Sequence, residues 1–166
     1  MKRLLFLLII FFAISLHSQN KIKKIEFSTK GYASAPDFDL IIYSDRTAIF
    51  NALSDNYKIP HNGEIVGYGT DKNGVNIKKS ELKGIFFTKL KVRDYKKIVK
   101  LIIALEKDFD KKKFNSNTLH SSTGKLRVIF ENGDAKYIYD DGMNGSKGLS
   151  ELYNYMEDLR FKQKWK

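Results

Sequence analysis

A histidine beside two hydroxyl side chains is the first feature of this sequence that could support a reaction. His120 is followed directly by Ser121 and Ser122. A histidine activates a hydroxyl nucleophile when the two side chains are held within hydrogen-bond distance. The Gly-x-Ser-x-Gly turn, which marks the nucleophile in one large group of hydrolases, does not occur in the chain. We therefore interpret His120 as a polar loop residue, and His61, which follows Pro60, as a turn residue.

A glycine-rich acidic segment partly matches a calcium-binding loop. In the segment from Asp140 to Glu151, positions one, five, six and twelve carry residue types that suit such a loop. Position three is Gly142, which offers no side-chain oxygen, and position eight is Lys147, whose charge would repel a cation. We interpret the segment as a connection from a strand to a helix and predict no metal site.

A hydrolase is the alternative to a non-enzymatic protein. Its site would lie near His120 or in the loop at Asp140 and Asp141. Acidic pairs such as Asp108 and Asp110 are interpreted as solvated, because closeness in sequence does not place two carboxylates across a scissile bond. The chain has no cysteine, which excludes a disulfide, a thiol nucleophile and a cysteine zinc site. We name no catalytic residue, expect no cofactor, and lean towards a protein without enzymatic activity.

Basic side chains are the strongest signal beyond those of the fold. The chain has 30 Lys and Arg residues against 19 Asp and Glu residues, a net charge of +11. Such an excess attracts anionic partners, although a solvated surface gives the same composition. Only 5 of the basic residues are arginines. Proteins that bind phosphate or nucleic acid favour arginine, because its side chain forms bidentate hydrogen bonds. We therefore expect the partner to be an envelope protein or an anionic polymer, and we expect no nucleic acid. The binding site predicted here comprises Lys89, Lys91, Arg93, Lys96, Lys97 and Lys100.

The first residues have the pattern of an export signal. Lys2 and Arg3 precede an apolar run at 4–16, and the sequence turns polar at His17. This run is too short for a membrane-spanning helix, which needs about 20 residues. We predict a signal peptide at 1–18, cleaved after Ser18, and an exported protein in the periplasm or outside the cell. An uncleaved membrane anchor is the alternative; after cleavage no stable membrane span is expected.

The first half of the remaining chain has the alternating pattern of strands. Apolar residues at every second position predict a strand at 22–28 and a hairpin with strands at 38–43 and 47–52. The small-residue segment 31–36 is expected to form a loop. Residues 55–76 are polar and glycine-rich, which predicts a long loop with one short strand near 64–68.

The second half combines helices with another hairpin. Residues 81–91 are apolar on both faces around Phe86, which predicts a strand in the centre of the sheet. Asp94 is expected to cap one amphipathic helix of about four turns that extends to Phe109. After a loop at 110–124, strands at 126–130 and 135–140 are joined through Asn132-Gly133, a strong hairpin signal. A last helix is predicted at 147–160, capped by Ser146.

This order of elements predicts one α+β domain at residues 19–166 with a short basic C-terminal tail. Short hairpin connections require antiparallel pairing, so the fold would be mainly an antiparallel sheet of hairpins. Two amphipathic helices would pack on one face of that sheet. At this length a hydrophobic core is large enough to be stable without disulfides.

The segment that starts at Gly31 resembles a family of exported bacterial domains of unknown function. Their opening motif reads Cys-Phe-Gly-x-Cys-Pro-x-Tyr-x-Leu, followed by a strand and an Asp-Gly-Thr turn. Pro36 and Leu40 match two of its positions, with Tyr32 in the place of Phe and Phe38 in the place of Tyr. Both family cysteines are absent, because Gly31 and Ala35 stand in their places, and Arg46 replaces the turn glycine. The resemblance covers most of residues 22–160 and implies fold and export but no activity. Together with the charge, it favours a non-enzymatic binding or interaction domain in the cell envelope.

Overall fold

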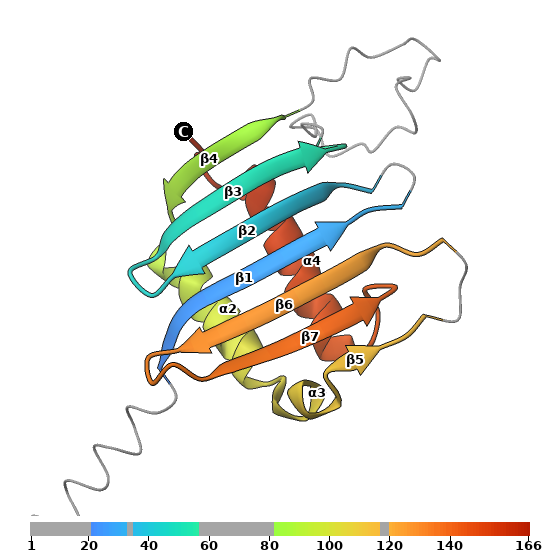
Figure 1. The fold of residues 1–166 in the computed structure, drawn as a ribbon. Helices are drawn as coiled ribbons and strands as arrows, with labels where there is room; N and C mark the ends of the chain where they lie inside the picture. The colour runs from blue at the N-terminus through green and yellow to red at the C-terminus, as the bar shows by residue number, and fades with distance from the viewer. Residues whose placement is uncertain (1–20, 33–34, 57–81, 117–119) are drawn as a thin grey trace, which may run out of the picture.

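The computed structural model describes residues 21–32, 35–56, 82–116 and 120–166, and these form a seven-stranded sheet with three helices. The strand order is β4-β3-β2-β1-β6-β7-β5, with only the β5–β7 pair parallel (Figure 1). The predicted α+β fold with a mainly antiparallel sheet is confirmed. The strands are β1 (Ile22–Lys30), β2 (Asp37–Tyr43), β3 (Thr47–Ser54), β4 (Gly84–Lys89), β5 (Lys113–Phe114), β6 (Thr123–Phe130) and β7 (Ala135–Asp141).

The strands form because apolar side chains alternate with polar ones. In β2 the buried side chains are Phe38, Leu40 and Ile42, and the residues between them face the other way. β1 lies in the centre of the sheet and pairs antiparallel with β2 and β6. Both predicted hairpins, β2 with β3 and β6 with β7, are present, and the core is built on one face of the sheet.

The turn between β6 and β7 forms at Asn132-Gly133, as predicted. Gly133 has a positive φ of 90°, which glycine adopts without strain, and its N–H donates to the carbonyl of Phe130 at 3.0 Å. The Asn132 side chain accepts from the N–H of Asp134 at 3.1 Å. In the described part of the chain only the glycine of this pair takes a positive φ, so one left-handed residue is enough to reverse the strand direction.

The helices are α2 (Val92–Ile103), α3 (Glu106–Lys111) and α4 (Lys147–Lys162). Figure 1 shows α2 and α4 on the same side of the sheet, as predicted. α4 places a stripe at helical spacing against the sheet that includes Leu149, Leu152 and Met156, all fully buried. Ser146 caps α4 as expected, because its hydroxyl accepts from the N–H of Leu149 at 3.1 Å.

The single four-turn helix predicted after Asp94 is wrong in two respects. The helix begins at Val92, so Asp94 lies within its first turn, where the Tyr155 hydroxyl donates to it at 3.0 Å. The chain then leaves helical geometry at Ala104 and Leu105 before α3 begins. There the N–H of Leu105 donates to the carbonyl of Ile102, three residues back, which tightens the last turn and sends the Leu105 side chain into the core.

The predicted central position of the strand at 81–91 is also wrong. β4 is one of the two border strands of the sheet, and among the strands of the described structure it pairs only with β3. Ile85 and Phe87 are 61% and 51% exposed, so the apolar residues on the outer face of β4 are not covered by another layer. The free edge of β4 instead pairs with the C-terminal tail. The N–H of Phe87 donates to the carbonyl of Lys166 at 2.9 Å, and the N–H of Lys166 donates to the carbonyl of Phe87 at 3.0 Å.

Other expectations differ in detail or fall outside the described residues. The segment predicted as a loop at 110–124 contains the short strand β5. Gly31 approaches Ala35 so closely that a Cβ atom on Gly31 would overlap the Ala35 carbonyl. The predicted signal peptide at 1–18 and the short strand near 64–68 lie outside the described residues. Among the residues that are described, no helix is long and apolar enough to cross a membrane.

Candidate functional site

The face of the sheet opposite α2 and α4 carries two different kinds of surface. Residues paired across the strands form one row on this open face. On the β4 side of the row lie Phe87, Ile49 and Ile41, which are apolar. On the other side β1 pairs with β6 and β6 with β7, and there the row continues with charged and tyrosine side chains. The open face is therefore apolar towards β4 and polar, cationic and aromatic over β1, β6 and β7.

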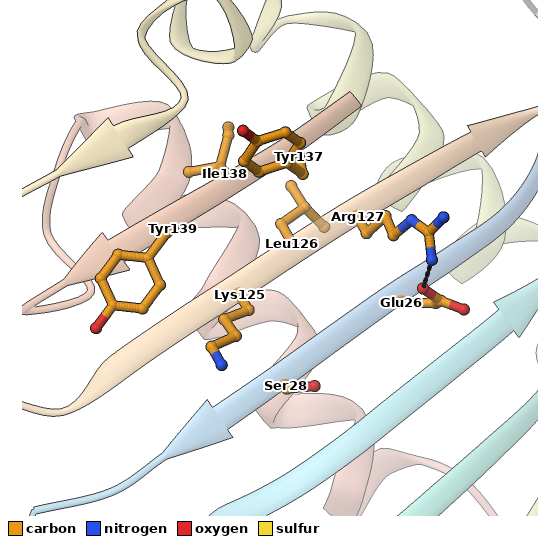
Figure 2. A pocket seen from close by; sticks show the side chains of 8 residues that line it. All are labelled: Glu26, Ser28, Lys125, Leu126, Arg127, Tyr137, Ile138 and Tyr139. Atoms are coloured by element: carbon orange, nitrogen blue, oxygen red, sulfur yellow. Dashed lines mark hydrogen bonds and ion pairs between the residues drawn. The ribbon is translucent and has the colours of Figure 1, made fainter. Parts of the chain in front are cut away.

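A shallow hollow of about 420 Å³ lies in this second half. Figure 2 shows that its walls come from three neighbouring strands. Tyr137 is 56% exposed, so its ring is open to a ligand. Arg127 reaches across from β6 to Glu26 on β1 at 3.4 Å, and Lys24 also pairs with Glu26 at 2.6 Å. The hollow is lined by Glu26, Ser28, Lys125, Leu126, Arg127, Tyr137, Ile138 and Tyr139.

Each tyrosine of the hollow has a cation beside it. Cross-strand pairing places Arg127 opposite Tyr137 and Lys125 opposite Tyr139. The Lys113 ammonium lies 6.0 Å from the centre of the Tyr139 ring, within the range of a cation–π contact. Glu26 is the one carboxylate among the lining residues, and it is already paired. The hollow thus offers aromatic ring surface with a local excess of positive charge, which suits a ligand that carries both apolar ring faces and anionic groups.

The six basic residues predicted as a binding site lie elsewhere. Lys89 ends β4, while the others precede α2 or lie on it, in the helix layer. All six side chains are exposed. Arg93 contacts the carboxylate of Asp94 at 3.7 Å, and the Lys97 ammonium lies 4.7 Å above the Tyr155 ring. These residues therefore form a second cationic surface, separate from the hollow, and its role in binding stays a prediction.

The structure brings the two alternative enzyme sites to the same end of the sheet without forming a catalytic pair. Thr123, close after His120, pairs with Asp141 at the end of β7. The Ser121 hydroxyl donates to the Asp141 carboxylate at 2.6 Å, so its proton is directed to an acid and not to the imidazole. The His120 ring instead stacks on Tyr32, with 4.8 Å between the ring centres. In the described residues no three His, Cys, Asp or Glu side chains are grouped to hold a metal.

Asp140 and Asp141 point to opposite faces of β7, as successive strand residues must. Asp140 is fully buried and accepts from the N–H of Gly145 at 3.0 Å through one oxygen. Its other oxygen has no hydrogen-bond partner in the described part of the chain. Burial raises the pKa of the Asp140 carboxyl, although the hydrogen bond from the N–H of Gly145 acts in the opposite direction. Asp140 therefore stabilises the turn before α4 and is not available to a ligand.

Replacing Asp140 with asparagine is expected to raise the stability of the protein more at pH 7 than at pH 4. A raised pKa in the folded state means that the carboxyl favours folding below its ordinary pKa of 3.8, and this contribution is lost as the pH rises through the folded-state pKa. Asparagine does not titrate and still accepts from Gly145. Urea denaturation at both pH values measures the difference. A difference in unfolding free energy that does not change with pH would contradict the assignment. Asp94 titrates in both proteins, so its contribution cancels.

The sequence prediction did not include the residues of the hollow, although a signal for them exists. Lys125 and Arg127 alternate with buried residues on β6, as Tyr137 and Tyr139 do on β7. The Asn132-Gly133 turn fixes how the two strands pair, so these four side chains had to share one face. What the sequence could not show is that this face has no helix over it in the described structure.

A comparison with protein families gives one match. The family described as a domain of unknown function, DUF6438, matches residues 23–160, which include every strand and helix of the described structure except the ends of β1 and α4. No curated protein and no solved structure matches the chain. The match covers most of the chain and places no activity on it. The chain belongs to the DUF6438 family.

Proposed function

We propose that this protein is an exported, non-enzymatic binding domain of the cell envelope or the extracellular space, and that its ligand is an anionic polymer. The observation that carries the proposal is the open sheet face, where lysine, arginine and tyrosine side chains surround a hollow. A sheet face that a monomer leaves uncovered and lines with exposed rings is typical of a binding surface.

Several features of the chain support export. Lys2, Arg3 and the apolar run at 4–16 have the pattern of a signal peptide. Pro36 and Leu40 match the opening motif of the exported bacterial domains that the sequence resembles, and Tyr32 stands in the place of its Phe. A domain without cysteine needs a hydrophobic core that is stable without disulfides, and the buried cluster of this fold supplies one. Outside the cytoplasm, anionic polymers are the partners that a surface rich in lysine would meet.

The hydrolase alternative lacks the arrangement it needs. General base catalysis requires that the histidine contact the nucleophile directly or through one water. Ser121 donates to Asp141, and the His120 ring stacks on Tyr32. These contacts join the segment before β6 to the end of β7 and to Tyr32, so the binding function is the one that the geometry supports best.

The proposal is tested by expressing the full chain in a bacterial host and assaying the product. We expect the protein in the periplasmic or extracellular fraction, with residues 1–18 removed. The purified product should bind at least one of polyphosphate, polyglutamate and polygalacturonate, and its affinity should fall as the salt concentration rises. Retention in the cytoplasm would contradict the export part of the proposal. Absence of binding to all three polymers, or binding that salt does not weaken, would contradict the anionic ligand.

A further inference from the structure

We infer that the hollow over β1, β6 and β7 binds carboxylated polysaccharides, with Tyr137 and Tyr139 against the sugar rings and Lys125 and Arg127 at the carboxylates. This inference rests on the proposed function and narrows it to one surface and one class of polymer. It makes the open sheet face the binding site in place of the basic surface on α2.

The two tyrosines give the hollow its affinity for ring-shaped ligands. They stand two residues apart on β7, so both side chains project from the same face, about 7 Å apart along the strand. Tyr137 is more than half exposed, and Tyr139 is half-buried. A tyrosine ring offers an apolar face to the C–H groups of a pyranose, while its hydroxyl exchanges hydrogen bonds with sugar hydroxyls. Two such rings in line fit neighbouring units of a polymer.

The cations repeat with the same spacing as the rings. Lys125 and Arg127 are also two residues apart, and each lies opposite one tyrosine. The site therefore consists of two similar halves, each with one ring and one positive charge (Figure 2). A polysaccharide that has one carboxylate on each sugar repeats the same pair of groups. Lys113, close to the Tyr139 ring, adds a further charge at the β5 side.

Glu26 favours a sugar over a more highly charged polymer. Its carboxylate lies in the hollow, where it would repel closely spaced phosphates but can accept a hydrogen bond from a sugar hydroxyl. Its contact with Arg127 at 3.4 Å also restricts the Arg127 side chain before a ligand binds. Binding then costs less side-chain entropy. Ser28, opposite Lys125, has a neutral hydroxyl that can also hydrogen-bond to a sugar hydroxyl. Because its two halves follow one another along β6 and β7, the shallow hollow suits a chain that runs in the direction of these strands.

The inference is tested with polygalacturonate and with its methyl ester, in which the same sugar ring carries no charge. Titration calorimetry should show binding to polygalacturonate and about tenfold weaker binding to the ester. Tyr139→Ala and Lys125→Gln should each weaken the binding of polygalacturonate about tenfold. Lys164→Gln is the matched control, because it removes an exposed lysine at the β4 border of the sheet and should leave the affinity unchanged. Thermal melting of each variant checks that the fold is intact.

Each other outcome overturns the inference in a recognisable way. Equal affinity for the ester would mean that the carboxylates are not recognised. Tighter binding of a single-stranded DNA oligonucleotide would assign the hollow to nucleic acid. If Lys96→Gln, Lys97→Gln and Lys100→Gln together abolish binding while the hollow variants do not, the anionic polymer binds on α2 and only the proposed function stands. Binding of polyphosphate or polyglutamate without binding of polygalacturonate would likewise refute the inference and leave the proposed function standing. Binding of no polymer would refute both the inference and the proposed function.

Discussion

Replacing Asn56 with alanine is expected to lower the free energy of unfolding by about 3 kcal/mol. Asn56 lies just after β3 with its side chain buried. Its amide nitrogen donates to the carbonyls of Asp37 and Ser54 at 2.7 and 2.8 Å, and its amide oxygen accepts from Arg160 at 2.9 Å. Alanine would leave two carbonyls and one buried guanidinium without these partners. The loss of partners for a charged group makes this cost larger than that of an ordinary hydrogen bond.

The guanidinium of Arg160 has few other means of compensation. Its Nε donates to the carbonyl of Glu157 at 3.1 Å, and its Cζ lies 4.9 Å from the centre of the Phe38 ring. Burial lowers its pKa, although the charge of Glu157 acts against this shift. The hydrogen bond to Asn56 therefore replaces much of the hydration that the guanidinium loses on burial.

A double-mutant cycle in urea separates this contact from the rest of the core. Asn56→Ala and Arg160→Met are measured alone and together. If the two side chains stabilise each other, the double variant loses less stability than the sum of the single losses. Leu53→Ala, which truncates an exposed side chain at the end of the same strand, is the control and should change little. Additive losses at Asn56 and Arg160 would contradict a direct interaction.

Local sequence patterns were sufficient for most of the elements. The alternation around Leu40, the Asn132-Gly133 turn and the Ser146 cap each depend on residues close together in the chain, and each is present as predicted. Local patterns also predicted the fold class, because hairpins that follow one another along the chain pair antiparallel. The same approach failed where a distant segment decides the result.

Two of these failures have a physical cause at one border of the sheet. The apolar residues around Phe86 suggested a strand between two others, but β4 is the border strand, and the residues that meet its free edge come from the far end of the sequence. Asp94 suggested a helix cap, but its carboxylate accepts from Tyr155 and Gln163, 61 and 69 residues away. Burial raises the pKa of Asp94, yet these hydrogen bonds and the charge of Arg93 hold it below its ordinary value.

The candidate site shows the same limit. Composition indicated a basic protein, and the lysines before and on α2 were grouped because they are close in sequence. The hollow depends on pairing between β1 and β6, whose residues Glu26 and Arg127 are 101 positions apart. No pattern within one segment shows that Glu26 lies beside Arg127 in the hollow.

Removing residues 164–166 is expected to destabilise the protein by about 3 kcal/mol and to promote self-association. The Trp165 ring lies 5.3 Å from the Phe50 ring, and its Nε1 donates to the carbonyls of Leu159 and Arg160 at the end of α4. The truncation would also free the edge of β4, because the backbone bonds between Phe87 and Lys166 would be lost. An unpaired border strand with exposed apolar side chains is prone to pair with another copy of itself.

The two effects can be separated by comparing the truncation with Trp165→Ala, which keeps the backbone of the tail. The substitution should cost about 2 kcal/mol through lost packing and leave the oligomeric state unchanged. The truncation should cost more, shift the protein towards larger species in size-exclusion chromatography, and speed hydrogen exchange at the Phe87 amide. Because that amide bonds to Lys166 in the intact chain, its exchange reports the edge directly. Unchanged exchange at Phe87 after truncation would show that the tail does not protect β4. The expected result instead makes the tail part of the sheet, which joins the end of α4 to the border strand.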